Sequence, residues 1–130
     1  MKVLFVNDDP VLRRLADYAL GTVGGMEVHM APDGASAIRD ADRLRPDVIL
    51  MELLMPEMDG DEVFETLKLS ERTRNVPVVF LTGIDNRVRT DAPLDAGVAG
   101  CPAKPFDPMS LADDLNRILD PVGARREEAQ

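Results

Sequence analysis

Polar side chains that could bind a cation and a phosphoryl group follow four short apolar runs of this chain. Carboxylate and amide oxygens are ligands for hard divalent cations, and hydroxyl and ammonium groups can contact phosphate oxygens. If the apolar runs are adjacent parallel strands, their carboxyl ends meet at one edge of a sheet, where open α/β sheets bind ligands. We therefore expect one site at this edge. Its candidate members are Asn7, Asp8, Asp9, Glu52, Thr82 and Lys104.

The elements that would position these residues alternate between strand-like and helix-like patterns. Continuous apolar runs are typical of strands buried on both faces, and apolar residues three or four apart are typical of helices packed on one side. Such alternation favours βα units and a parallel sheet. The sequence predicts strands at residues 2–6, 27–30, 48–51, 76–81 and 100–103, and helices from Asp9 to Gly21, from Asp33 to Pro46, around 63–67, at 85–96 and at 108–119.

Local signals set the expected ends of two of these helices. Asp9 can cap the first helix because its side chain accepts from free amides, and Pro10 suits the first turn. Gly21 can end that helix. The segment 85–96 is a weak helix, because Pro93 in a helix interior removes a hydrogen bond and costs ~3 kcal/mol. We expect this helix to be short or broken.

Size and composition indicate one acidic domain. The chain has 130 residues, of which 45% are hydrophobic, and its formal net charge is −9. That charge argues against nonspecific binding to nucleic acid or anionic lipid. A single cysteine, Cys101, excludes an internal disulfide and fits a reducing compartment. No apolar run approaches the ~20 residues of a membrane span, so we expect a cytoplasmic protein.

Two stretches resemble the receiver domain of bacterial two-component response regulators. Residues 52–60 read Glu-Leu-Leu-Met-Pro-Glu-Met-Asp-Gly and are similar to the family's Asp-x-x-Met-Pro-x-Met-Asp-Gly, and residues 104–106 match its Lys-Pro-Phe. The resemblance covers roughly residues 2–119. It implies a flavodoxin-like, doubly wound α/β fold with a five-stranded parallel sheet in the order 2-1-3-4-5. It also implies a receiver domain at 1–120, and we expect a flexible tail at 121–130.

The resemblance also implies a role for each candidate site residue. Glu52 stands at the phosphoacceptor position, where the family normally has Asp, and Thr82 and Lys104 would contact the phosphate. Asn7 replaces an acid, so one negative charge is lost and Mg²⁺ binding should be weakened. The alternative is that Asn7, Asp8 and Asp9 only cap the first helix. If the chain is a receiver, the resemblance implies that Mg²⁺ is bound by Asp8, Asn7, Glu52 and the backbone carbonyl of Leu54.

Glu52 is the departure with the largest consequence. Glu is one methylene longer than Asp and moves the carboxylate oxygens by more than ~1 Å, a misplacement that can cost ~10²-fold in rate. We therefore predict weak or no phosphorylation, and a carboxylate that reaches toward Lys104 and Thr82 and partly mimics a phosphate, which carries a charge of ~−1.5 to −2. Two alternatives stay open. The chain is a genuine phosphorylatable receiver that tolerates Glu52, or Glu52 is an engineered change.

A further departure favours a phosphate-independent signalling module over a phosphorylatable receiver, and the loop after the first strand argues against an enzyme. Cys101 stands where receivers usually carry an aromatic residue, so the usual coupling to Thr82 should be absent. A nucleotide- or flavin-binding enzyme would need a Gly-rich or hydroxyl-rich loop after the first strand, where this chain has Asn-Asp-Asp-Pro. The expected partners are a histidine kinase or phosphotransfer protein and a downstream protein. We expect no binding to nucleic acid or membrane, and a monomer or weak dimer.

Overall fold

The computed structural model describes residues 1–81, 98–100 and 109–119. The predictions that fall on other positions therefore concern residues outside the described part of the chain. They are those for Thr82, Cys101, Lys104, the helix at 85–96 and the tail at 121–130.

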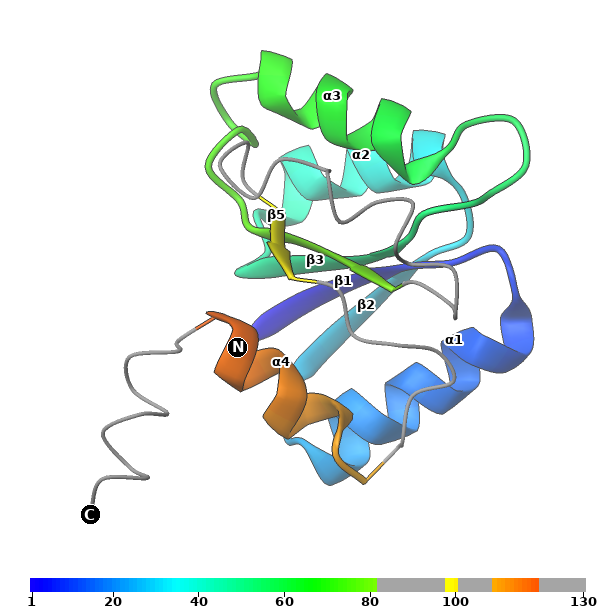
Figure 1. Cartoon of the computed structure of the whole chain (residues 1–130), viewed down its shortest axis with the longest axis vertical. Helices are drawn as coiled ribbons and strands as arrows, with labels where there is room; N and C mark the ends of the chain where they lie inside the picture. The colour runs from blue at the N-terminus through cyan, green and yellow to red at the C-terminus, as the bar shows by residue number, and fades with distance from the viewer. Residues whose placement is uncertain (82–97, 101–108, 120–130) are drawn as a thin grey trace.

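The described residues form a five-stranded parallel sheet in the order β2-β1-β3-β4-β5 (Figure 1). This order is the one predicted for a doubly wound α/β fold. Apolar, largely β-branched or aromatic runs form the central strands, as expected for strands covered on both faces. The strands are β1 (Lys2–Val6), β2 (Glu27–Ala31), β3 (Val48–Glu52), β4 (Val78–Leu81) and β5 (Val98–Gly100).

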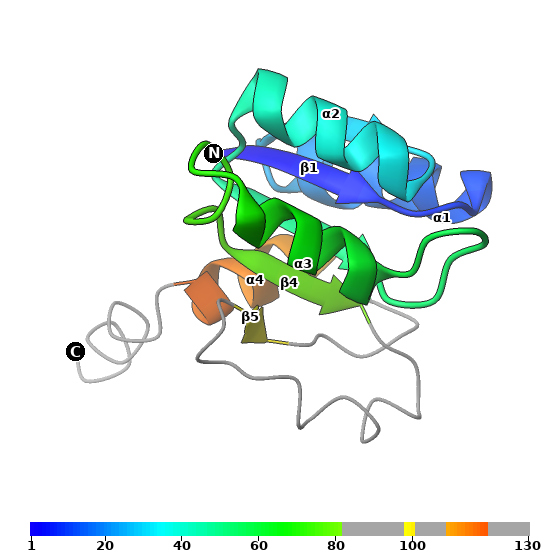
Figure 2. The ribbon, with the colours of Figure 1, turned by 90° about the horizontal axis from the view of Figure 1, so that it is seen from above.

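Helices cover both faces of the sheet (Figures 1 and 2). On one face lie α2 (Gly34–Leu44) and α3 (Gly60–Leu69), and on the other lie α1 (Pro10–Ala16), the π-helix η1 (Asp17–Val23) and α4 (Leu111–Leu119). Successive residues of a strand point to opposite faces, so each central strand contributes to both cores. The first core contains Leu4, Val6, Ile49 and Met51, and the second contains Val3, Phe5, Val48 and Leu50.

The first helix continues beyond its predicted end at Gly21. After α1 the chain widens into η1, and the N–H of Gly24 donates to the carbonyl of Ala19 at 3.1 Å, a bond across five residues. At the end of this extra turn Gly24 lies close against α4, since a Cβ at this position would be 2.5 Å from Cβ of Ala112. The end comes at Gly24 and Gly25, where Gly25 adopts a left-handed φ of 71°. The prediction for Gly21 was therefore wrong.

Other boundaries differ by a few residues. β5 begins at Val98 and not at residue 100, because Val98 pairs with Val78 across an irregular register. The last helix begins at Leu111, later than the predicted start at 108. The second helix starts and ends as predicted: it begins after Asp33, whose side chain caps it, and it ends at Leu44, two residues before the proline.

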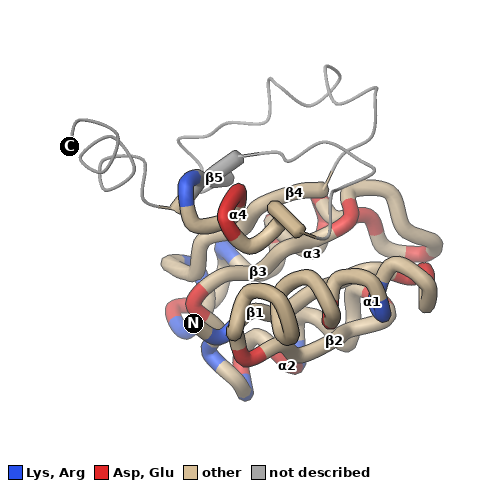
Figure 3. The backbone as a smooth tube through the Cα atoms, turned by 90° about the horizontal axis from the view of Figure 1, so that it is seen from below, with Lys and Arg blue, Asp and Glu red and all other residues tan. Residues whose placement is uncertain are grey.

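Acidic positions gather in the loops at the carboxyl side of the sheet (Figure 3). They are Asp8 and Asp9 before α1, and Glu57 and Asp59 before α3. In the part of the chain that the structure describes, no helix is both long and apolar enough to cross a bilayer.

Candidate functional site

Strand register brings two of the predicted site residues to neighbouring positions at the carboxyl edge. Val6 of β1 pairs with Met51 of β3, so Asn7 and Glu52 are the next residues on adjacent strands. Neighbouring strands lie about 4.8 Å apart. Glu52 in turn pairs with Leu81 of β4, the residue before Thr82. Asn7 and Glu52 therefore lie next to each other at this edge, while Thr82 and Lys104 lie outside the described residues.

Asn7 is almost fully buried, with 1% of its surface exposed. Its Oδ1 accepts from the backbone N–H of Asp9 at 2.9 Å, and its own N–H donates to the carbonyl of Ala31 at 3.1 Å. The Nδ2 amide is also buried and has no hydrogen-bond partner among the described residues. The side chain therefore turns its oxygen into the local backbone turn and leaves its donor group unused.

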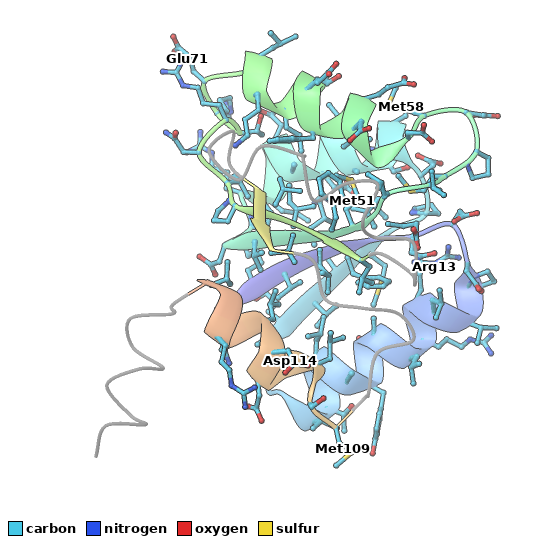
Figure 4. The ribbon with its side chains drawn as sticks, viewed as in Figure 1. Arg13, Met51, Met58, Glu71, Met109 and Asp114 are labelled. Atoms are coloured by element: carbon cyan, nitrogen blue, oxygen red, sulfur yellow. The ribbon has the colours of Figure 1, made fainter. Side chains whose placement is uncertain are left out.

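Arg13 is a positioning residue that was missed in the sequence, where it reads as part of an isolated basic pair. Its Nη1 donates to the backbone carbonyl of Asn7 at 2.8 Å, from the first turns of α1 (Figure 4). Hydrogen bonds from a guanidinium are among the stronger ones. The spacing of six residues across a cap is the only sequence signal that could have indicated this contact. Arg13 fixes the turn that carries Asn7 and Asp8.

The two aspartates after Asn7 have different surroundings. Asp9 caps α1: its Oδ1 accepts from the N–H of Val11 at 2.9 Å, and Pro10 occupies the first turn. This matches the predicted cap. Asp8 is exposed, so its carboxylate faces solvent at the rim of the site.

Glu52 is the last residue of β3 and is buried, with 6% of its surface exposed. Its Oε1 accepts from the backbone N–H groups of Leu53 at 3.1 Å and Leu54 at 3.4 Å. Successive backbone N–H groups form a small concavity that favours an anion. The Glu52 carboxylate therefore lies against the donors of its own loop. The side chain of Leu54, by contrast, is 69% exposed.

The loop after Glu52 is held by one close backbone approach. Gly60 donates its N–H to the carbonyl of Leu53 at 2.7 Å. A Cβ at this position would lie 2.7 Å from the carbonyl oxygen of Glu52 and 2.8 Å from Cε1 of Phe80, distances that real Cβ atoms do not show. Within the loop, Glu57 has a left-handed φ of 69°, where the N–H of Met58 donates to the carbonyl of Pro56 at 2.7 Å.

Two of the four predicted Mg²⁺ ligands, Asn7 and Glu52, use a side-chain oxygen to accept hydrogen bonds from the backbone, which is not the arrangement predicted for a metal site. The oxygen of Asn7 is held by the N–H of Asp9, and Oε1 of Glu52 is held by two loop amides. No group of three or more His, Cys, Asp or Glu residues suited to a metal occurs within the described ranges. Asp8 offers one exposed carboxylate at the rim.

Comparison with known proteins places this arrangement in a family. Residues 3–116 match the family model described as the response regulator receiver domain. The DNA-binding dual master transcriptional regulator RpaA of Synechocystis is 33% identical over 118 residues, which cover 91% of this chain and 48% of the regulator. The chain spans about half the length of this curated relative, and it spans 24% of the response regulator PleD of Caulobacter vibrioides, to which it is 37% identical.

Solved structures agree with the family match. The chemotaxis protein CheY4 of Vibrio cholerae superposes with a TM-score of 0.82 at 31% identity and covers 90% of this chain and 97% of its own. The receiver domain of the sensor histidine kinase PA1611 of Pseudomonas aeruginosa gives a TM-score of 0.76 at 33% identity, with 92% of this chain and 93% of its own covered. That structure has a magnesium ion coordinated in its active-site cleft.

Proposed function

Because the chain belongs to the response regulator receiver domain family of two-component signalling, we propose that it is a receiver that signals without being phosphorylated. In this proposal the carboxylate of Glu52 stands permanently at the acceptor position and partly takes the place of a phosphoryl group. The module acts by binding proteins and not as an enzyme.

The hydrogen bonding of Glu52 is the observation that carries the proposal. Its Oε1 already accepts from the N–H groups of Leu53 and Leu54. These donors stand beside the acceptor position, where they would otherwise stabilise negative charge on an incoming phosphoryl group. A phosphoryl transfer to Glu52 would have to break these bonds and move the longer side chain. A carboxylate with one charge imitates a phosphate of about −1.5 to −2 only in part, so the expected signalling state is intermediate.

Receiver domains interact with histidine kinases or phosphotransfer proteins, and we propose that this chain binds a protein of that kind. A second protein would read its state downstream. The net charge of −9 gives this domain no general attraction for nucleic acid. The DNA binding of RpaA belongs to that protein, of which the chain spans 48%. A monomer or weak dimer fits a module of this size.

A phosphorylatable receiver is the second candidate, and the exposure of Asp8 favours it. An exposed carboxylate at the rim could supply one direct ligand to Mg²⁺, an ion that keeps several waters when it binds proteins. The loop after Glu52 also has the family's Met-Pro-x-Met-Asp-Gly sequence, and the hydrogen bond from Gly60 to Leu53 holds its backbone. In this candidate Glu52 is a tolerated acceptor.

Intact-mass measurement after incubation with Mg²⁺ and acetyl phosphate separates the two candidates. We expect no phosphate adduct on the wild type and a metal-dependent adduct on the double variant Asn7→Asp/Glu52→Asp, because Asp at position 7 restores the missing charge at the cation position and the shorter side chain at position 52 leaves the loop amides to the phosphoryl group. Glu62→Asp, the same change at an exposed position of α3, is the matched control and should stay unmodified. An adduct mapped to Glu52 of the wild type would establish the phosphorylatable receiver instead.

A further inference from the structure

We propose that Asn7 makes the carboxyl edge of this sheet reject divalent cations, because its amide presents a donor where a cation needs an oxygen. This proposal depends on the proposed function in one respect: it takes that edge of the sheet to be the signalling site. Cation binding and phosphorylation are separate properties and are measured separately. The proposal stands on the orientation, burial and supports of the Asn7 side chain.

The orientation of the Asn7 amide follows from its partner. The backbone N–H of Asp9, 2.9 Å away, is a donor and requires an acceptor, so the side-chain oxygen must face it. The NH₂ group therefore occupies the other side, at a position that is buried and has no hydrogen-bond partner among the described residues. By strand register, residue 7 is the neighbour of Glu52 on the adjacent strand.

If the amide turned to offer its oxygen to a cation, two hydrogen-bond donors would face each other. The NH₂ group would then face the N–H of Asp9, and the hydrogen bond that closes this turn would be lost. Neighbouring contacts resist a movement of the whole turn, because Arg13 holds the carbonyl of Asn7 and Ala31 accepts from its N–H. Loss of one buried hydrogen bond corresponds to roughly a tenfold loss of cation affinity.

Charge acts in the same direction. An amide is neutral, so the edge carries one carboxylate fewer than it would with Asp at position 7. Opposite charges within a few ångström are strongly attractive at a buried position, since the effective dielectric constant is below that of water. Asn7 therefore lowers cation affinity both by its donor and by its missing charge.

Titration with MgCl₂, followed by the backbone amide signals in ¹H–¹⁵N NMR spectra, tests this proposal. We expect Asn7→Asp to bind Mg²⁺ at least about tenfold more tightly than the wild type, with saturable shifts at residues 7–9 and 52–54. The matched control is Asn75→Asp, which adds the same charge at an exposed position of the loop after α3 and should bind as the wild type does. Equal affinity of Asn7→Asp and the wild type, or an equal gain in Asn75→Asp, would overturn the proposal.

A thermal measurement covers the case in which Asn7→Asp does not fold. A ligand that binds only the native state raises Tm as its concentration rises. For the wild type we expect the same Tm in MgCl₂ and in a chelator at matched ionic strength. The contrary result would be a higher Tm in MgCl₂ for both the wild type and Asn75→Asp, together with saturable NMR shifts at Asp8 and Leu54. It would show that the native site binds the cation and that Asn7 does not prevent this. Neither readout depends on phosphorylation.

Discussion

Replacing Gly60 with alanine should destabilise the protein and displace the loop that carries the Glu52 hydrogen bonds. The added methyl group would lie 2.7 Å from the carbonyl oxygen of Glu52, 2.8 Å from Cε1 of Phe80 and 3.0 Å from Cα of Leu53. Two of these three atoms are backbone atoms at the end of β3, which no side-chain rotation can move. Either the strand end or the start of α3 must shift, and the 2.7 Å bond from Gly60 to Leu53 is then strained.

The expected loss follows from these contacts. Overpacking a well-packed position lowers the free energy of unfolding by about 1–3 kcal/mol. Because Gly60→Ala would clash with backbone atoms, we expect a loss in the upper part of this range, about 2–3 kcal/mol. For a domain of this size 1 kcal/mol changes Tm by roughly 3–5 °C, so Tm should fall by roughly 6–15 °C. Urea unfolding followed by far-UV circular dichroism measures the free energy directly, in a chain that has no tryptophan.

Gly21→Ala is the matched control for this prediction. A Cβ at Gly21 would meet no atom nearer than 3.6 Å, which is ordinary contact. Alanine is favoured over glycine inside a helix by roughly 0.5–1 kcal/mol, so this variant should be as stable as the wild type or more so. A loss of less than about 0.5 kcal/mol in Gly60→Ala, the range of a neutral surface change, would refute the reasoning about the close approach.

Two further substitutions test how the site and its scaffold are held. Arg13→Ala should cost about 1 kcal/mol in urea unfolding, because it removes the donor to the Asn7 carbonyl, whereas Arg14→Ala on the exposed side of α1 should be nearly neutral. Asp33→Ala should cost about 1 kcal/mol at neutral pH by removing the cap of α2. Hydrogen bonds from the backbone and hydroxyl of Ser36 lower the pKa of Asp33 below its ordinary 3.8. The stabilisation is therefore complete above that value and is lost as the pH falls through the lower pKa of the folded state. Unfolding curves between neutral and acid pH should show the difference between wild type and Asp33→Ala shrinking only in acid. A difference that stays constant in acid would contradict the assigned pKa shift.

Features set by short-range chemistry were predictable from the sequence. The Asp9 cap of α1 and the start of α2 at Asp33 were predicted, because such cap bonds span only two or three residues. The strand order, by contrast, followed from the resemblance to the receiver family, and it placed Asn7 and Glu52 at the same edge of the sheet. The end of the first helix was not predictable in the same way, because it lies at Gly24, where the chain closely approaches Ala112 of α4, a residue far away in the sequence.

The orientation of the site side chains depended on contacts that the sequence does not display. The sequence placed Asn7 among the oxygen ligands, but the N–H of Asp9 takes its oxygen and Arg13 fixes its backbone. The prediction that Glu52 reaches toward Thr82 and Lys104 stays untested, since both lie outside the described residues. What the structure adds is that one oxygen of Glu52 lies against the amides of Leu53 and Leu54.

The amide signals of Leu53 and Leu54, recorded before and after adding acetyl phosphate and Mg²⁺, test the central claim most directly. If Glu52 permanently occupies these donors, both signals should stay unchanged in the wild type and should move in the double variant Asn7→Asp/Glu52→Asp. They should also move in Glu52→Ala without any phosphate donor, because the internal acceptor is gone. Wild-type signals that shift on addition of acetyl phosphate and return as it is hydrolysed would contradict the claim and identify a working phosphorylation switch.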